Sequence, residues 1–365
     1  MVKLSLVQLS DSSRDLWDDF VSANLHAYVY HLWEWGNVLE KTYNLRKWYL
    51  AVREDQHIVG VLPIFCVRGL FFADKLVSLP FCEYGGPLLA DYLGQSMAEN
   101  VLTMLMKSVY ELAEKLKIDY IELRHPQIPF SNFFSSSGFR VLQRYVTFSL
   151  DLTRGEGEIW KGFGGYTRRR AVVRRLERAR RIRTKVEEVG GDNLEHYYTL
   201  YLKTQKRRGS PPHSYAFFEN LYEGFGAKNL LHMFLAVSKG KPIAGMTIFC
   251  LNRKLYCWNS VIDRKYAGSH PTDFLLWHLI RWGIENDFRV IDFGRTRPED
   301  TGVYYFKSRW GGQKTRLKDY VFLSGNAEIP DPLQRKYVLL SRLWSLVPQS
   351  LACKVGPYLT SRLGL

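Results

Sequence analysis

Two stretches of the chain alternate between apolar runs and short polar turns in the same way. Tyr49 to Phe65 reads YLAVREDQHIVGVLPIF, and Phe234 to Cys250 reads FLAVSKGKPIAGMTIFC. Apolar runs on both sides of a polar turn are typical of a β-hairpin. At a constant offset of 185 positions, the two stretches share Leu50/Leu235, Ala51/Ala236, Val52/Val237, Ile58/Ile243 and Gly60/Gly245. The pattern predicts an internal repeat built on two hairpins.

Each predicted hairpin is followed by a helix and then by a strand with an acidic residue near its end. Residues 97–116 and 274–284 carry apolar side chains at helical spacing, and they lead into YIELR (120–124) and VIDFGR (290–295). The repeated order predicts an α+β (α/β) fold of two tandem domains with mixed sheets flanked by helices. We expect domains at 1–155 and 191–330, a basic helical linker at 156–190 and a basic amphipathic tail at 331–365.

The linker contains an arginine-rich segment, YTRRRAVVRRLERARRIR, from 166 to 183. As a helix it would place Val172, Leu176 and Ala179 on one face and a ridge of arginines on another. That ridge is expected to bind anions through Arg168, Arg169, Arg170, Arg174 and Arg175, and the alternative is a solvated face. The tail is expected to form two short amphipathic helices, split at Pro348 and Gly356.

Charge and composition narrow the function classes. The chain of 365 residues has 51 Lys and Arg against 36 Asp and Glu, a net charge of +15, which implies an anionic partner such as nucleic acid, a phosphorylated substrate or anionic lipid. The five cysteines are scattered singly, and no apolar stretch reaches the length of a spanning helix. We therefore expect a monomeric cytoplasmic protein, with a peripheral position at the inner membrane face left open.

Several catalytic signatures are missing from the sequence. It has no Gly-x-Ser-x-Gly elbow, no His-Glu-x-x-His motif, no phosphate-binding loop and no dinucleotide fingerprint. We expect no metal and no bound cofactor. A remaining possibility is direct transfer, in which a neutral amine attacks an ester or thioester carbonyl and the site orients two substrates and stabilises an oxyanion.

The run DFGRTRPEDTGVYYFKSRWG, from Asp292 to Gly311, resembles the C-terminal signature of the FemAB family. It is most similar to FemAB-like proteins found with exosortase and exopolysaccharide systems. WEWGNVL (33–39), LPFCEYGGPL (79–88) and KRRGSPPHSYAFFENL (206–221) also agree with these proteins. The resemblance extends over nearly the whole chain and implies two tandem GNAT-like acyltransferase domains.

The resemblance also implies an activity. FemAB-like proteins form an amide by moving an aminoacyl or acyl group to an amine of a cell-envelope, peptidoglycan or polysaccharide precursor. The donor would be aminoacyl-tRNA or acyl-CoA, and the acceptor a phosphorylated or a nucleotide- or lipid-linked sugar or peptide. The segment RKYAGSHP (264–271) lacks the usual coenzyme A loop, and the sequence shows no long coiled-coil arm of the kind linked to tRNA. Both donors therefore stay open.

Two alternatives accompany this hypothesis. One is an acyl-CoA-dependent N-acetyltransferase acting on an amino sugar. The other is a non-catalytic RNA- or membrane-binding protein with a degenerate acyltransferase fold.

The resemblance makes Lys307 a catalytic candidate, and the position of Asp292 at the predicted strand end makes it a second one. Lys307 could stabilise an oxyanion or hold a donor phosphate, whereas Asp292 could orient or deprotonate the acceptor amine. An exposed lysine and an Asp292–Arg295 ion pair are the corresponding structural alternatives. Substrate contacts are expected from Arg295, Tyr304, Phe306, Trp310, Tyr84, Gly85, Gly86 and Trp35, although the aromatics could equally be core and Tyr84–Gly86 a plain turn.

Overall fold

The structure is a computed structural model that describes residues 3–70, 73–124, 131–163, 166–324, 328–329, 331 and 333–364. The chain forms two compact units. Unit 1 comprises Met1–Gln143, Lys318–Gln334 and Tyr358–Leu365, and unit 2 comprises Arg144–Leu317 and Arg335–Pro357. This division is interleaved along the chain, unlike the linear ranges expected from the sequence, because the end of β13 (Gln313–Leu323) pairs with β6 (Tyr120–Leu123) of unit 1.

The sheet of unit 1 is mixed. Its strands lie in the order β1 (Leu4–Leu9), β2 (Arg46–Glu54), β3 (His57–Val67), β4 (Lys75–Val77), β6 and the end of β13, and β5 (Leu88–Leu89) pairs with β3. Only β4 and β6 pair in parallel among these strands as described. The unit's helices are α1 (Arg14–Ala23), α2 (Trp33–Tyr43), α3 (Gln95–Leu116) and α4 (Ser131–Ser136). The apolar face of α3, with Val101, Leu105 and Val109, is buried in the unit 1 core.

Unit 2 repeats this plan. Its strands lie in the order β7 (Arg140–Asp151, in this unit from Arg144), β12 (Val290–Asp292), β11 (Lys254–Ile262), β10 (Lys241–Leu251), β9 (Leu231–Ser238) and β8 (Thr184–Glu188). Strands β11 and β12 pair in parallel. The helices are α5 (Gly155–Lys161), α6 (Tyr166–Arg181), α7 (Leu194–Arg208), α8 (Tyr215–Phe225), α9 (Pro271–Glu285), α10 (Thr301–Ser308), α11 (Arg335–Leu346) and the first part of α12 (Gln349–Leu363).

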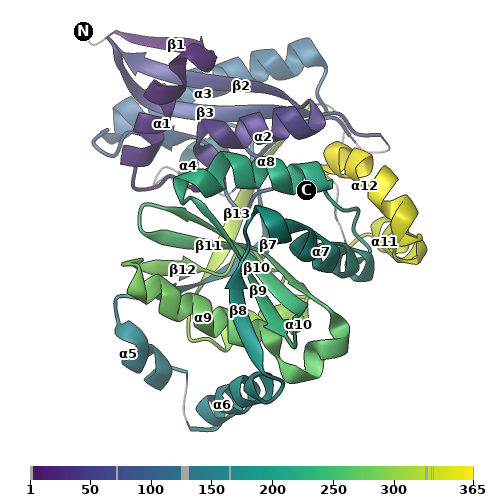
Figure 1. The fold of residues 1–365 in the computed structure, drawn as a ribbon. Coiled ribbons are helices and arrows are strands. Elements are labelled where there is room, and N and C mark those ends of the chain that lie inside the picture. Colours follow the sequence, from purple (N-terminus) through teal and green to yellow (C-terminus); the bar gives the residue numbers. More distant parts are fainter. Residues whose placement is uncertain are drawn as a thin grey trace. The chain divides into compact units, whose positions relative to one another are not determined.

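The internal repeat predicted from the sequence is confirmed (Figure 1). The hairpins are β2–β3 and β9–β10, both antiparallel, and each is followed by a third strand. A helix, α3 or α9, then leads to a strand, β6 or β12, that runs parallel to this third strand. The predicted class of mixed sheets flanked by helices is therefore confirmed.

The predicted helices of the linker and the tail are also present. Val172, Leu176 and Ala179 are buried on one face of α6, as the spacing predicts. The tail forms α11 and α12, which are separated around Pro348. The predicted split at Gly356 is wrong, because α12 continues through it. None of the helices in the described part of the chain is long and apolar enough to cross a membrane.

Candidate active site

The candidate active site of unit 2 begins where β12 ends. Asp292 is the last residue of this strand, and its Oδ1 accepts hydrogen bonds from the Thr147 hydroxyl at 2.8 Å and from the Gly294 backbone N–H at 2.7 Å. Gly294 has a φ of 73°, a left-handed conformation that favours glycine. The carboxylate therefore holds the turn after the strand in a fixed shape.

Lys307 binds the backbone carbonyl oxygens of the same turn. It lies on α10, whose N-terminus is capped by the Asp300 side chain. The Lys307 ammonium donates to the carbonyl oxygens of Gly294 at 2.9 Å and Arg295 at 3.2 Å. Asp292 and Lys307 thus bind the N–H and the C=O of one residue, Gly294. The structure brings the two predicted catalytic residues to one turn, and their catalytic roles stay a prediction.

Two guanidinium groups lie over one tyrosine ring beside this turn. The guanidinium carbons of Arg295 and Arg297 are 4.6 Å and 5.5 Å from the centre of the Tyr145 ring. Arg297 also donates to the Tyr145 hydroxyl at 3.2 Å. A β-bridge between Val146 and Thr296 brings the two segments together. Two neighbouring cations raise the local positive potential, so an anionic ligand would be stabilised here.

A buried ion pair lies at the N-terminus of α9. The side chains of Asp273 and Arg309 pair there and are 3% and 11% exposed. His270 Nδ1 lies 3.8 Å from Asp273 Oδ2, and His270 Nε2 lies 3.4 Å from a guanidinium nitrogen of Arg178. Burial raises the pKa of Asp273, which Arg309 and Arg175 oppose, and burial lowers the pKa of His270. A carboxylate therefore lies at a helix N-terminus, the kind of position that often binds phosphate.

The arginines of α6 differ in exposure. Arg170 and Arg174 are exposed, whereas Arg169 and Arg175 are half-buried. The side chain of Arg168 lies outside the described residues. The positive charge of Arg175 lowers the pKa of both His270 and Asp273, so Arg175 lies close to the ion pair of α9. Anion binding by these arginines stays a prediction, and Arg170 and Arg174 are its most accessible members.

Trp310 lies in the core of unit 2. Its side chain is 0% exposed, and its ring packs against Phe163 and Trp277 at centroid distances of 5.5 Å and 6.5 Å. A substrate could reach this ring only after the core opened. The indole stabilises the end of α10 through packing.

The other aromatic residues of α10 lie nearer the surface. Tyr304 is half-buried, and its hydroxyl accepts a hydrogen bond from the Lys314 ammonium at 2.9 Å. Phe306 is half-buried, with the Arg309 guanidinium carbon 4.7 Å from its ring centre. Tyr305, at 59% exposure, presents the most accessible ring of this helix. Tyr305 is therefore better placed to contact a ligand than Tyr304.

In unit 1, the predicted substrate residues lie in the loop of residues 79–86 or, as Trp35 of α2 does, pack against it. Trp35 is 0% exposed and donates its indole N–H to the Pro80 carbonyl oxygen at 3.2 Å. Tyr84 is 2% exposed and stacks on Tyr28 at a centroid distance of 4.5 Å. These aromatic side chains fix residues 79–86 from within.

The glycines of this loop lie where its backbone comes close to neighbouring residues. The Gly85 N–H donates to the Arg124 carbonyl oxygen at 2.7 Å, and a Cβ at Gly85 would lie 3.0 Å from the Leu79 Cβ. Gly86 has a φ of 99°. The His31 imidazole bonds the Gly86 carbonyl oxygen at 3.1 Å, and burial lowers the pKa of His31 to about 4. These contacts account for the turn as a structural feature, and a ligand role stays a prediction.

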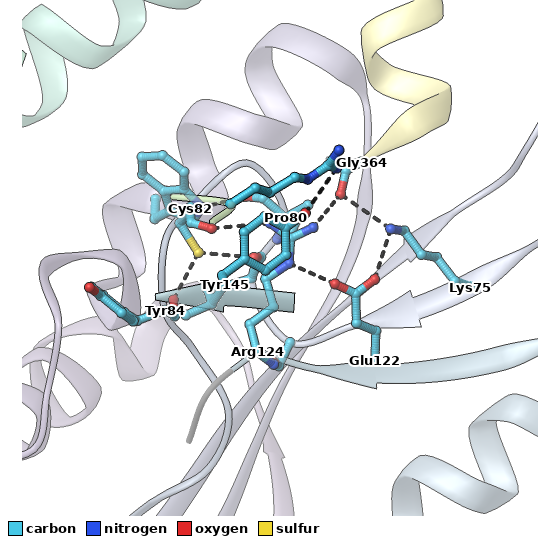
Figure 2. Close-up of polar contacts among 12 residues, drawn as sticks. Lys75, Pro80, Cys82, Tyr84, Glu122, Arg124, Tyr145 and Gly364 are labelled. Carbon is cyan, nitrogen blue, oxygen red and sulfur yellow. Dashed lines mark hydrogen bonds and ion pairs between the residues drawn. The ribbon is translucent and has the colours of Figure 1, made fainter. Parts of the chain in front are cut away.

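The end of β6 carries a buried ionic cluster (Figure 2). Glu122 accepts from the Lys75 ammonium and from Arg124 Nε, both at 3.0 Å. Arg124 also donates to the carbonyl oxygens of Cys82 at 3.1 Å and Gly364 at 2.7 Å. Lys75 and Arg124 are 4% and 5% exposed, and burial lowers the pKa of Lys75, which Glu122 opposes. At this strand end the charges bind one another.

Two parts of the unit 2 site were not anticipated from the sequence. Tyr145 is 150 positions from Arg295, and no local pattern links them. Asp273, in the first turn of α9, has the position of a favourable N-terminal acid, but its partner Arg309 belongs to another helix. Across the described residues, no cluster of His, Cys, Asp and Glu could hold a metal ion.

A cavity of about 500 Å³ lies apart from the predicted residues. It is formed by α5, α6 and α9, and is lined by Glu156, Gly157, Trp160, Val173, Leu176, Arg180 and Trp277. The candidate catalytic residues do not line it.

Comparisons with known proteins agree with this architecture. The family model described as "Acetyltransferase (GNAT) domain" matches residues 166–308, a range that contains β12, its turn and Lys307. "Lipid II:glycine glycyltransferase" of Staphylococcus haemolyticus (strain JCSC1435) is 27% identical over 244 residues, covering 62% of this chain and 54% of that protein. The chain spans about half the length of the curated relatives it matches.

Solved structures share the fold at low sequence identity. The structure described as "Crystal structure of FemX" matches with a TM-score of 0.66 at 14% identity, covering 92% of this chain and 100% of that chain. A tandem GNAT protein from the clavulanic acid biosynthesis pathway matches with a TM-score of 0.56 at 12% identity, covering 89% and 100%. The expected tandem GNAT-like fold is confirmed.

Proposed function

We propose that this chain moves an aminoacyl group onto an amine of a peptidoglycan precursor. Its relatives and its fold support a FemAB-like protein with two GNAT-type units. The observation that carries this proposal is the turn after β12. Asp292 accepts a hydrogen bond from the N–H of Gly294 in this turn, and Lys307 donates one to the Gly294 carbonyl oxygen. The Arg295 and Arg297 guanidinium groups lie beside the turn.

The proposed reaction is a direct acyl transfer. The neutral acceptor amine attacks the ester carbonyl of the donor, a C–N bond forms, the ester C–O bond breaks, and the amine proton is transferred to the leaving alkoxide. Asp292 at the strand end orients the amine and receives its proton transiently. The Lys307 ammonium and the nearby Arg295 and Arg297 guanidinium groups supply positive potential where the carbonyl oxygen becomes negative.

For the donor, we favour aminoacyl-tRNA over acyl-CoA. The curated relatives are named for glycine transfer. At the N-terminus of α9, a bound diphosphate would meet the buried carboxylate of Asp273, which already pairs with Arg309. The exposed Arg170 and Arg174 of α6 are suited to contact several phosphates of a nucleic acid.

For the acceptor, we propose a lipid-linked peptidoglycan precursor at the inner face of the membrane. The relatives' printed name includes lipid II, whose diphosphate is anionic. The net charge of +15 favours such a partner and a peripheral position in the cytoplasm.

A second candidate is an acyl-CoA-dependent N-acetyltransferase, which the description of the matched family model favours. A third is a non-catalytic RNA- or membrane-binding protein, for which the exposed arginines of α6 would suffice.

One assay separates these candidates. The purified chain is incubated with radiolabelled glycyl-tRNA and lipid II, or with labelled acetyl-CoA and glucosamine, and amide products are separated by chromatography. Transfer from glycyl-tRNA alone supports the proposal, whereas transfer from acetyl-CoA alone replaces it with the second candidate. RNA binding without turnover from either donor supports the third.

The arginine ridge has its own test. Arg170→Gln combined with Arg174→Gln should weaken tRNA binding about tenfold and reduce its salt dependence. Arg253→Gln, at an exposed arginine of the β10–β11 turn, is the matched control. Unchanged binding in the double variant would remove α6 from the donor site.

A further inference from the structure

Helix α11 and the first part of α12 carry apolar side chains on their solvent side. Leu339, Leu343 and Leu346, at helical spacing, are 56%, 54% and 76% exposed. Such spacing places three leucines on one face of α11. We call the whole set the leucine face, and it consists of Val338, Leu339, Leu340, Leu343, Leu346, Leu351 and Val355.

The leucine face points outward because the opposite face is docked on unit 2. Ser341 of α11 lies so close to Gly209, after α7, that a Cβ at Gly209 would be 2.2 Å from the Ser341 carbonyl oxygen. The Ser341 hydroxyl also donates to the Arg208 carbonyl oxygen at 3.2 Å. In α12, Gly356 packs against Pro212, which would be 2.4 Å from an added Cβ. These close contacts oppose a rotation that would bury the leucines.

The residues around the leucine face are basic. The segment from 333 to 357 contains no Asp or Glu, and its described cations are Arg335, Arg342 and Lys354. Exposed Arg207 and Arg208 end α7, which packs against α11. Exposed apolar side chains at helical spacing, with cations on the same helices, are typical of a helix that lies in the interface of an anionic bilayer.

A second copy of the chain fits this surface less well. In a symmetric pair the same patch contributes from both copies, so the cations beside the leucines would face one another. Such like-charge contacts oppose association.

We propose that α11 and the first part of α12 are a membrane-docking surface for anionic phospholipid. The leucine face enters the boundary between headgroups and acyl chains, and Arg335, Arg342 and Lys354 bind the lipid phosphates. This docking goes beyond the acyl transfer and does not depend on it, so it is tested without any substrate.

The test is sedimentation of the full chain with vesicles of phosphatidylcholine, alone or mixed with phosphatidylglycerol in equal parts. Wild type should sediment with the mixed vesicles and be released by salt. Leu339→Ser, Leu343→Ser and Leu346→Ser together should lower the partition coefficient by about tenfold or more, since they remove most of the inserted apolar surface of α11. These side chains are exposed, so thermal unfolding should be unchanged.

Two further variants keep the result interpretable. Leu25→Ser with Tyr92→Ser removes exposed apolar side chains of unit 1, 67% and 71% exposed, and should bind like wild type. Arg335→Gln, Arg342→Gln and Lys354→Gln together should abolish the preference for phosphatidylglycerol. The proposal is overturned if the wild type does not bind the mixed vesicles, or if the variant with the three Leu→Ser changes binds them as well as the wild type does. A wild-type dimer in light scattering that the leucine variant converts to monomer, without vesicle binding, overturns it in favour of a second copy.

Discussion

The ends of β6 and β12 occupy the same place in the two repeats but use their charges differently. At β6, Glu122 pairs with Lys75 and Arg124, and both cations are almost completely buried. At β12, Asp292 binds a hydroxyl and a backbone N–H, and two half-buried arginines lie over Tyr145. The first arrangement stabilises a fold, whereas the second brings cations together where we propose that an anionic substrate binds.

The largest expected effect is on stability, in unit 1. Glu122→Gln removes the carboxylate between two buried cations, and breaking a buried ion pair costs about 3–5 kcal/mol of unfolding free energy. Urea unfolding followed by circular dichroism measures it. Glu114→Gln, at an exposed glutamate of α3, is the control. A Glu122 variant as stable as this control would show that the cluster is not structural.

The corresponding change in unit 2 should affect turnover and leave stability largely unchanged. Lys307→Ala removes the ammonium that binds the Gly294 and Arg295 carbonyls, and the proposed aminoacyl transfer should fall roughly 100- to 1,000-fold. Lys314→Ala, which removes the contacts to the hydroxyl and the ring of Tyr304, should retain activity.

The Lys307 experiment also separates a catalytic role from a positioning role. Lys307→Arg keeps a cation that can bind both carbonyls, so recovery of substrate affinity without recovery of kcat would indicate a direct catalytic role. Wild-type turnover in Lys307→Ala would exclude this lysine from the reaction.

Acid should destabilise the loop of unit 1 through His31. Burial lowers its pKa from 6.5 to about 4, so the unfolded chain binds a proton in a range where the folded chain does not. Between pH 6.5 and 4 this difference should remove roughly 3 kcal/mol of unfolding free energy. His31→Asn should flatten the pH profile measured by urea unfolding. Burial also lowers the pKa of His213 to about 3, so the unfolding free energy of the His31→Asn variant should still fall somewhat as the pH falls.

The control for this titration is His196→Asn, at an exposed position of α7. An unchanged pH profile in the His31 variant would contradict the assignment of the acid sensitivity to unit 1.

A smaller effect is expected at the arginine pair of unit 2. Arg297→Gln leaves Arg295 over the Tyr145 ring but removes one of the two cations, so kcat/KM for the anionic substrate should fall about tenfold. Steady-state kinetics should show the loss mainly in KM. Arg289→Gln, at an exposed arginine after α9, should behave like wild type. A normal KM in Arg297→Gln would show that the pair does not bind substrate.

The sequence predicts those features that depend on neighbouring residues. Alternation in the hairpins and helical spacing in α3, α6 and α9 are local, and the structure confirms them. The interleaving of the units depends on the pairing of Val321 with Glu122, about 200 positions apart, which no local pattern encodes. Tyr145 was missed for the same reason. Gly356 was misread because α12 uses it for packing against Pro212, not for a break.

The most direct test of the difference between the strand ends is to map where the donor binds. A transfer RNA charged with a photoreactive amino acid is crosslinked to the full chain, and the modified peptides are identified by mass spectrometry. Crosslinks within residues 292–309, lost on competition with glycyl-tRNA, are the predicted result. Crosslinks confined to residues 78–86 and 122–124 of unit 1 would contradict the assignment of the reacting centre to unit 2.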